Sequence, residues 1–192
     1  MGVLGHSFPR VELRTLGILQ FSHLSASSAE WPVSSTYSPR LAYGLGIGLS
    51  FPVSQKVSLE TDILYKTKRS ELTKFSDLDW NDTFYDLRCL AVPLLAQARF
   101  QISKIELRAI LGAEGSWIFN SRIEDKKDDI ILEPIPGLKS YDLQAVGGVG
   151  ILYQRISLEF RYQYGLLNLS KERESGLSIR NHGFEFLIGF RL

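Results

Sequence analysis

The sequence predicts an all-β protein, an eight-stranded antiparallel up-and-down transmembrane β-barrel formed as a single domain by residues 1–192. Three observations predict it. Apolar and polar residues alternate with period two in eight segments, which is typical of strands with one buried face. The connections between these segments alternate between long and short. Aromatic residues gather at both ends of the apolar faces, as they do in barrels that span an outer membrane.

The clearest strand covers residues 41–51, where the odd positions are Leu, Tyr, Leu, Ile, Leu and Phe. Its even positions include Gly44, Gly46 and Gly48. A dinucleotide loop needs the spacing G-x-G-x-x-G at a turn from strand to helix. These glycines lie inside a strand and on one face, so we expect them to face the lumen and to leave room for arginine and glutamate side chains from other strands. The same role is expected of Gly112, Gly148 and Gly150.

The other strands repeat this alternation. They are expected at residues 11–22, 57–67, 84–100, 105–119, 141–153, 156–166 and 184–192. Two are less regular. The first carries Leu16 and Ile18 on its otherwise polar side, and the segment 84–100 changes phase near Pro93, which predicts a β-bulge there.

Four connections are long and polar, and we expect them as loops at about residues 23–40, 68–83, 120–140 and 168–181. The other connections are tight turns, so in an up-and-down sheet all the turns lie at one end. Outer-membrane barrels have short periplasmic turns and long external loops. This predicts external long loops and two periplasmic termini, with residues 1–9 as a periplasmic tail.

Alternation alone also fits a soluble lipocalin-like barrel with an apolar interior. The membrane is favoured because aliphatic residues fill the apolar faces between two aromatic girdles. The polar face carries charges of both signs, which suits a lumen just wide enough to be filled by paired side chains. These charges are Glu60, Asp62, Lys66, Arg88, Arg99, Glu106, Arg108, Glu114, Glu159, Arg161, Glu185 and Arg191.

The segments "GLGIGLSFPVSQKVSLETDILY", "LRCLAVPLLAQARF", "ELRAILGAEGSWIF", "GGVGILYQRISLEFRYQYGLLNL" and "FEFLIGFRL" resemble, in this order, the PorT-like small outer-membrane β-barrels of Bacteroidetes. The resemblance spans about residues 41–192. It implies an eight-stranded barrel in the outer membrane, with no catalytic motif, and some members belong to secretion or other outer-membrane assemblies. Such barrels usually end in an aromatic residue, whereas here Phe190 lies two residues before Leu192.

The net charge and the first ten residues limit where the protein can be located and what it can bind. The net charge of +1 argues against a nucleic-acid surface. The start "MGVLGHSFPR" lacks the basic region and apolar core of a signal peptide. An outer-membrane location therefore implies a sequence that begins after a removed signal. The expected contacts are outer-membrane lipid and another outer-membrane protein or complex, with no nucleic acid and no small-molecule substrate.

Several groups of residues are candidates for chemical sites. A lipid hydrolase needs a serine near a histidine, and the candidates are His6, His23 and His182 with Ser22, Ser25, Ser27 and Ser28. Calcium would need more oxygen ligands than Asp77, Asp79 and Asp82 supply. Cys89 is interpreted as a residue that packs in the barrel wall. We assign no catalytic, cofactor-binding or metal residue.

The expected function is a non-enzymatic outer-membrane barrel that serves as an accessory or scaffold subunit of a protein complex. The charged run 124–129 is expected as a solvated loop tip. The apolar residues after it, Ile130, Ile131, Leu132, Ile135 and Leu138, suggest packing on a partner or on neighbouring loops. The alternatives are a stand-alone binding or adhesion barrel, a lipid-modifying enzyme, and a soluble lipocalin-like carrier.

Overall fold

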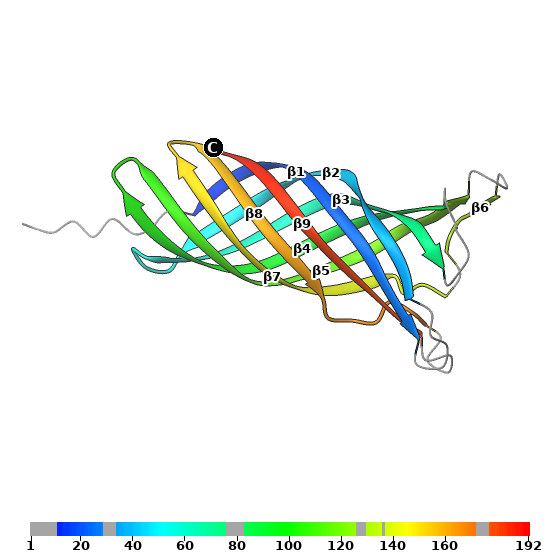
Figure 1. Ribbon diagram of the computed structural model, residues 1–192. Helices are drawn as coiled ribbons and strands as arrows, with labels where there is room; N and C mark the ends of the chain where they lie inside the picture. The colour runs from blue at the N-terminus through cyan, green and yellow to red at the C-terminus, as the bar shows by residue number, and fades with distance from the viewer. Residues whose placement is uncertain (1–10, 29–33, 76–82, 126–129, 136, 172–176) are drawn as a thin grey trace, which may run out of the picture.

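The structure, a computed structural model, describes residues 11–28, 34–75, 83–125, 130–135, 137–171 and 177–192 (Figure 1). These residues form nine strands: β1 (Glu12–Ser28), β2 (Ser34–Pro52), β3 (Val57–Phe75), β4 (Thr83–Ile102), β5 (Ile105–Asp125), β6 (Ile130–Leu132), β7 (Tyr141–Tyr153), β8 (Ile156–Gly165) and β9 (Leu177–Arg191). In this part of the chain no helix is long and apolar enough to cross a membrane.

Eight of the strands close into a barrel, as predicted. The order around it is β4-β3-β2-β1-β9-β8-β7-β5, every neighbouring pair is antiparallel, and pairing of β4 with β5 completes the circle. The three-residue strand β6 pairs only with the end of β5. The start of β1, the end of β9 and the short turns all lie at one end of the barrel (Figure 1). We call this the short-turn end and the opposite one the long-loop end.

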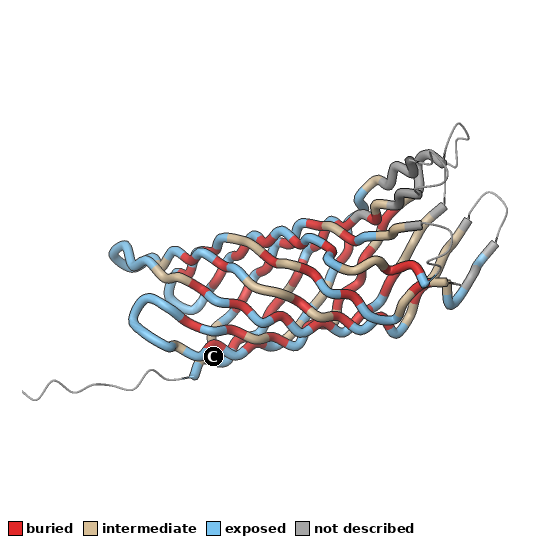
Figure 2. The backbone as a smooth tube through the Cα atoms, turned by 90° about the horizontal axis from the view of Figure 1, so that it is seen from below, coloured by how far each residue is buried: buried red, intermediate tan, exposed pale blue. Residues whose placement is uncertain are grey.

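The polar faces of the strands point inward and the apolar faces point outward. Along β8 the buried residues are Ser157, Glu159, Arg161 and Gln163, while the residues between them are exposed. Figure 2 shows the same alternation of buried and exposed positions along the whole barrel. A soluble carrier barrel has the opposite arrangement, so the lipocalin-like alternative is wrong.

The strands extend further toward the long-loop end than the period-two alternation of the sequence predicts. β1 continues to Ser28, β3 to Phe75 and β5 to Asp125, while β2 already begins at Ser34. Much of the expected loops 23–40, 68–83 and 120–140 is therefore extended chain. The hydrophobic period fades there because both faces of these extensions carry polar residues.

The β-bulge expected at Pro93 is wrong. Pro93 pairs in regular register with Glu114, and the shift lies instead between Arg88 and Cys89, where β5 places one extra residue, Phe119, opposite them. β4 therefore keeps its phase through Pro93, with Cys89 buried and Arg88 exposed. The prediction that Arg88 faces the lumen is corrected accordingly.

The lumen near the short-turn end is filled by a network around two arginines. Arg14 donates to Oε1 of Glu159 at 2.6 Å and to Oδ1 of Asp62 at 3.0 Å. Arg161 donates to Oε1 of Glu60 at 2.9 Å and to Oε2 of Glu159 at 2.5 Å. All five side chains are almost fully buried. Mutual pairing and hydrogen bonds offset the large cost of removing these charges from water.

A second network lies further along the lumen. Lys66 donates to Glu114 and Glu185 at 2.6 Å each, and Lys68 donates to Oε1 of Gln144 at 3.1 Å. Eight predicted lumen charges are thus confirmed as buried: Glu60, Asp62, Lys66, Arg108, Glu114, Glu159, Arg161 and Glu185. Arg99, Glu106 and Arg191 are only partly buried, toward the short-turn end.

An apolar plug closes the lumen at the long-loop end. Leu138, from the connection before β7, and Leu169, from the connection after β8, pack with wall residues. The full buried cluster is Leu24, Leu87, Cys89, Ile118, Leu138 and Leu169. Backbone bonds hold the two connections together, since the amide of Lys139 donates to the carbonyl of Leu169 at 2.8 Å. Two smaller buried apolar clusters pack among the inward side chains, namely Leu16, Ile18, Leu64, Ala91 and Leu187, and Leu95, Ile110 and Val146. The described residues therefore fill the barrel with both ionic and apolar groups.

The lumen-facing glycines make room for neighbours, but not always for charges. A Cβ at Gly48 would overlap Oδ1 of Asp62, and one at Gly150 would lie 3.0 Å from Cγ of Glu159, as predicted. Gly46 instead makes room for the Leu64 side chain, and Gly112 for the backbone of β4. The expectation of charged neighbours is wrong for these last two positions.

Candidate functional site

An aromatic girdle marks the outer wall at the long-loop end. Tyr65 pairs with Leu90, Leu90 with Trp117, and Trp117 with Tyr141, so these outward residues form one row across β3, β4, β5 and β7. Trp117 and Tyr141 are exposed. Amphipathic aromatic rings of this kind sit at the boundary between hydrocarbon and headgroups.

Arginines lie just beyond this row. Two residues past Tyr65 comes the row of Thr67, Arg88 and Asn120, and two residues further comes the row of Arg40, Arg69, Asp86 and Arg122. Four consecutive strands thus present one concentrated group of cations on the outer wall. We call Arg40, Arg69, Arg88 and Arg122 the arginine belt.

Three of the four arginines form ion pairs with carboxylates. Arg69 Nε donates to Asp86 at 3.0 Å within the same row. Arg40 Nε donates to Glu71 at 2.7 Å, and Arg122 lies 3.3 Å from Glu124. Glu71 and Glu124 belong to the next row toward the long-loop end, where both pair with Phe84. Arg88 makes no ion pair within the described part of the chain.

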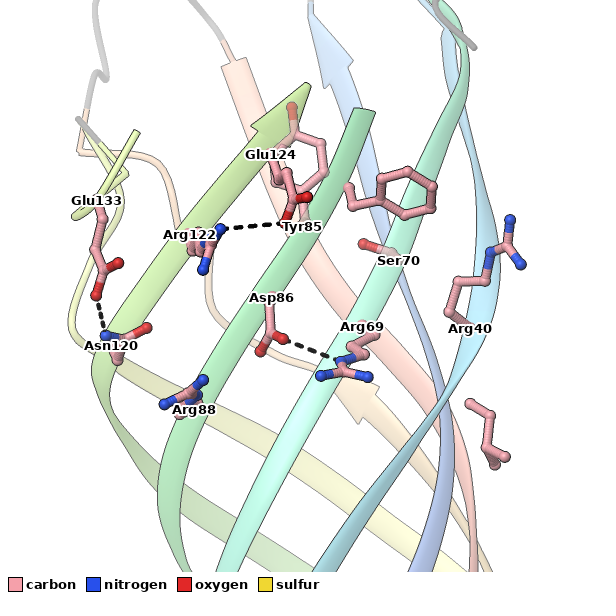
Figure 3. Close-up of a pocket in the computed structure, with 12 residues that line it drawn as sticks. Arg40, Arg69, Ser70, Tyr85, Asp86, Arg88, Asn120, Arg122, Glu124 and Glu133 are labelled. Atoms are coloured by element: carbon pink, nitrogen blue, oxygen red, sulfur yellow. Dashed lines mark hydrogen bonds and ion pairs between the residues drawn. The ribbon is translucent and has the colours of Figure 1, made fainter. Parts of the chain in front are cut away.

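The belt surrounds a cavity of about 760 Å³. Figure 3 shows Arg69, Asp86, Arg88 and Arg122 along β3, β4 and β5 at this cavity. Leu41 and Phe84 add apolar surface, and the Arg40 guanidinium lies 5.6 Å from the centre of the Phe84 ring. Guanidinium groups with apolar surroundings are suited to bind carboxylate or phosphate groups of a ligand.

The family model for the outer membrane protein beta-barrel domain matches residues 15–171. The chain belongs to this family. Its place is therefore the outer membrane, and its outward apolar surface faces lipid. No curated protein sequence matches the chain.

Solved structures share the fold of this outer-membrane barrel. OprG from Pseudomonas aeruginosa is 13% identical with a TM-score of 0.60, over 95% of each chain. Neisserial surface protein A is 13% identical with a TM-score of 0.54, over 94% of this chain and 97% of that one. At these identities the likeness shows the fold alone.

One of the candidate serine–histidine pairs is brought together. Nε2 of His182 in β9 lies 3.1 Å from Oγ of Ser25 in β1, and its ring centre lies 4.7 Å from that of Tyr164. Both Ser25 and His182 point outward at the long-loop end. The backbone of His23 pairs with that of His182, while the His23 side chain and all of His6 lie outside the described residues.

Other predicted groups have different outcomes. Asp77, Asp79 and Asp82 lie outside the described residues, and within them no cluster of His, Cys, Asp and Glu could hold a metal ion. Cys89 packs in the wall as expected. Of the apolar loop residues, Ile135 and Leu138 pack in the plug, whereas Ile131 is exposed.

Sequence reasoning missed the arginine belt. Arg40 and Arg69 were assigned to polar loops, and Arg88 to the lumen. A usable signal exists on β3, where Tyr65, Thr67 and Arg69 continue the outward face in steps of two. The four arginines can be assigned to rows only when the pairing register and the bulges of β2, β3, β4 and β5 are known. The structure provides both.

Proposed function

We propose that this protein is a non-enzymatic outer-membrane barrel that serves as an accessory or scaffold subunit of an outer-membrane protein complex. The resemblance to PorT-like barrels of Bacteroidetes supports this proposal. We further propose that both termini are periplasmic and that the long-loop end is external, because outer-membrane barrels place their long loops outside.

The filled lumen is the observation that carries the proposal. Two ionic networks and the apolar plug occupy it in succession. An eight-stranded barrel has no wide channel to begin with, and within the described residues side chains occupy its lumen. This filling supports a protein that acts through its surfaces, namely the outer wall and the long-loop end.

Purification in mild detergent from the native membrane tests the subunit role. We expect a larger outer-membrane protein to co-purify at a fixed ratio with the tagged barrel. The variant Ile131→Asp, in an exposed residue of β6, should weaken this association if the partner contacts the β5–β6 hairpin. A lone species of monomer size would contradict the subunit role and favour a stand-alone binding barrel.

A lipid-modifying enzyme is the second candidate, favoured by the contact between Ser25 and His182. A serine with a histidine in reach can attack an ester while the imidazole accepts its proton. The pair faces outward at the long-loop end, where lipid is accessible. Release of fatty acid from outer-membrane lipid that is lost in Ser25→Ala and kept in Ser54→Ala, at the opposite end, would establish this activity.

A further inference from the structure

We propose that the arginine belt binds the phosphate groups of a phosphorylated glycolipid in the outer leaflet. The outer-leaflet assignment rests on the proposed orientation with the long loops external. The phosphate chemistry itself, and its test in detergent, depend neither on this orientation nor on a partner protein. The proposal assigns a ligand class to a cavity that the subunit role leaves unused.

The depth of the belt matches the headgroup layer. Residues on a tilted transmembrane strand advance about 3.4 Å each, at about 45° to the membrane normal. Arg88 therefore lies about 5 Å above the aromatic row, and the row of Arg69 lies about 10 Å above it. The polar layer of a bilayer is about 5–8 Å thick on each side. Long arginine side chains can reach back into it by snorkelling.

The order of charges along the strands also favours an anion at this depth. From Tyr65 toward the long-loop end, the row of Arg88 carries no carboxylate, the row of Arg40, Arg69 and Arg122 carries the single carboxylate Asp86, and Glu71 and Glu124 follow in the next row. Arg40 and Arg69 are direct cross-strand neighbours. Like charges placed opposite each other are unfavourable unless a counter-charge lies between them. Glu71 and Asp86 each pair with one of these two arginines, and a phosphate bound between the guanidinium groups adds a shared counter-charge on the membrane side.

The existing ion pairs do not block such binding. Pairs at an exposed surface contribute little to stability, and the side chains of Arg40 and Arg69 are 53% and 42% exposed. A guanidinium presents five donors, so it can keep its carboxylate and still donate to a phosphate. Arg88, which is exposed and has no ion pair in the described part of the chain, offers all of its donors.

Apolar groups beside the arginines favour a lipid over a free ion. Leu41 and Phe84 line the same cavity, and the Arg69 guanidinium lies 5.9 Å from the centre of the Tyr43 ring. Tyr43 and Leu41 continue into the lipid-facing surface of β2. A ligand with a phosphate in the belt would thus run its acyl chains along this wall.

The test is binding to the purified, folded barrel in a non-ionic detergent, measured by native mass spectrometry and by titration. The probes are bisphosphorylated lipid A, the same lipid after removal of its phosphates, phosphatidylethanolamine, and inorganic phosphate. We expect the bisphosphorylated lipid to bind most tightly and to weaken as salt rises. Arg88→Gln should weaken binding about tenfold, the size of one charge-assisted hydrogen bond. The triple variant with Arg69→Gln and Arg122→Gln should abolish it.

Two controls keep the result interpretable. Arg155→Gln changes an exposed arginine at the short-turn end and should bind like the parent. Heat-modifiable gel mobility shows whether each variant is folded, and Arg88→Gln breaks no ion pair, so it should fold normally. Equal affinity of Arg88→Gln and the parent would overturn the proposal. Equal binding of the dephosphorylated lipid, or full competition by inorganic phosphate, would overturn it as well.

Discussion

Lys66 joins two carboxylates that come from different sides of the barrel: its Nζ lies 2.6 Å from Oε1 of Glu114 in β5 and 2.6 Å from Oε1 of Glu185 in β9. All three side chains are almost completely buried. Lys66 itself belongs to β3, so one ammonium group bridges three strands that pairing alone does not connect. The carboxylates depend on it because a buried charge without a partner is strongly unfavourable.

Lys66→Met should therefore destabilise the barrel by about 3–5 kcal/mol, the usual cost of removing one partner from a buried ion pair. The measurement is reversible urea unfolding in lipid vesicles. Lys56→Met, in the exposed turn between β2 and β3, is the matched control and should change little. Adding Glu114→Leu and Glu185→Leu to Lys66→Met should recover most of the loss, because the charges then disappear together. A triple variant less stable than Lys66→Met would contradict this explanation.

The glycine at position 48 should be intolerant of any side chain. A Cβ there would overlap Asp62 and come within 2.8 Å of Nε of Arg14. Gly48→Ala is expected to cost about 1–3 kcal/mol, as overpacking does in well-filled interiors. Gly147→Ala is the control, because no atom lies within 4 Å of its added Cβ, and it should be nearly neutral. Equal unfolding midpoints for the two variants would refute the tight packing around Gly48.

The barrel and its inverted polarity were predictable from sequence because both follow from period two. Glu159 and Arg161, for instance, alternate with Leu158 and Phe160, and the aromatic ends of the strands distinguish lipid from water as the outer solvent. Strand residues outside the segments that alternate with period two were not predictable. Beyond Tyr65 the strand β3 becomes polar on both faces, so its extension to Phe75 leaves no hydrophobic signal.

The candidate site was harder still, since it depends on register. Arg40 and Arg122 are 82 residues apart in sequence, and they share a row only through the pairings of β2 with β3, β3 with β4 and β4 with β5. The shift opposite Arg88 adds one residue to β5. A single bulge wrongly placed moves a whole set of side chains to the other face, and the bulge expected at Pro93, where β4 in fact keeps its register, put Arg88 on the lumen face.

The filled lumen predicts an electrically silent barrel. Reconstituted protein in a planar bilayer should give no conductance steps. Removing the apolar plug with Leu138→Ala and Leu169→Ala should still give none, because the network around Lys66 and Lys68 remains below it. Stable conductance of the parent protein would show that the ionic layers open, and it would contradict a filled lumen.

The plug itself should be the first part of the lumen to open. Leu169 is fully buried, and its amide donates to the carbonyl of Ile179 at 2.8 Å, which ties the β8–β9 connection to the wall. Leu169→Ala removes buried contacts that typically contribute about 2–5 kcal/mol, so the open form becomes more populated. Trypsin should then cleave after Lys139 several-fold faster, since cleavage tracks the population of the open form when reclosing is fast. Ile131→Ala, at an exposed position, should be cleaved at the parental rate. If Leu169→Ala resists trypsin as well as the parent does, the connections are held at the mouth by their backbone bonds rather than by the packing of Leu169.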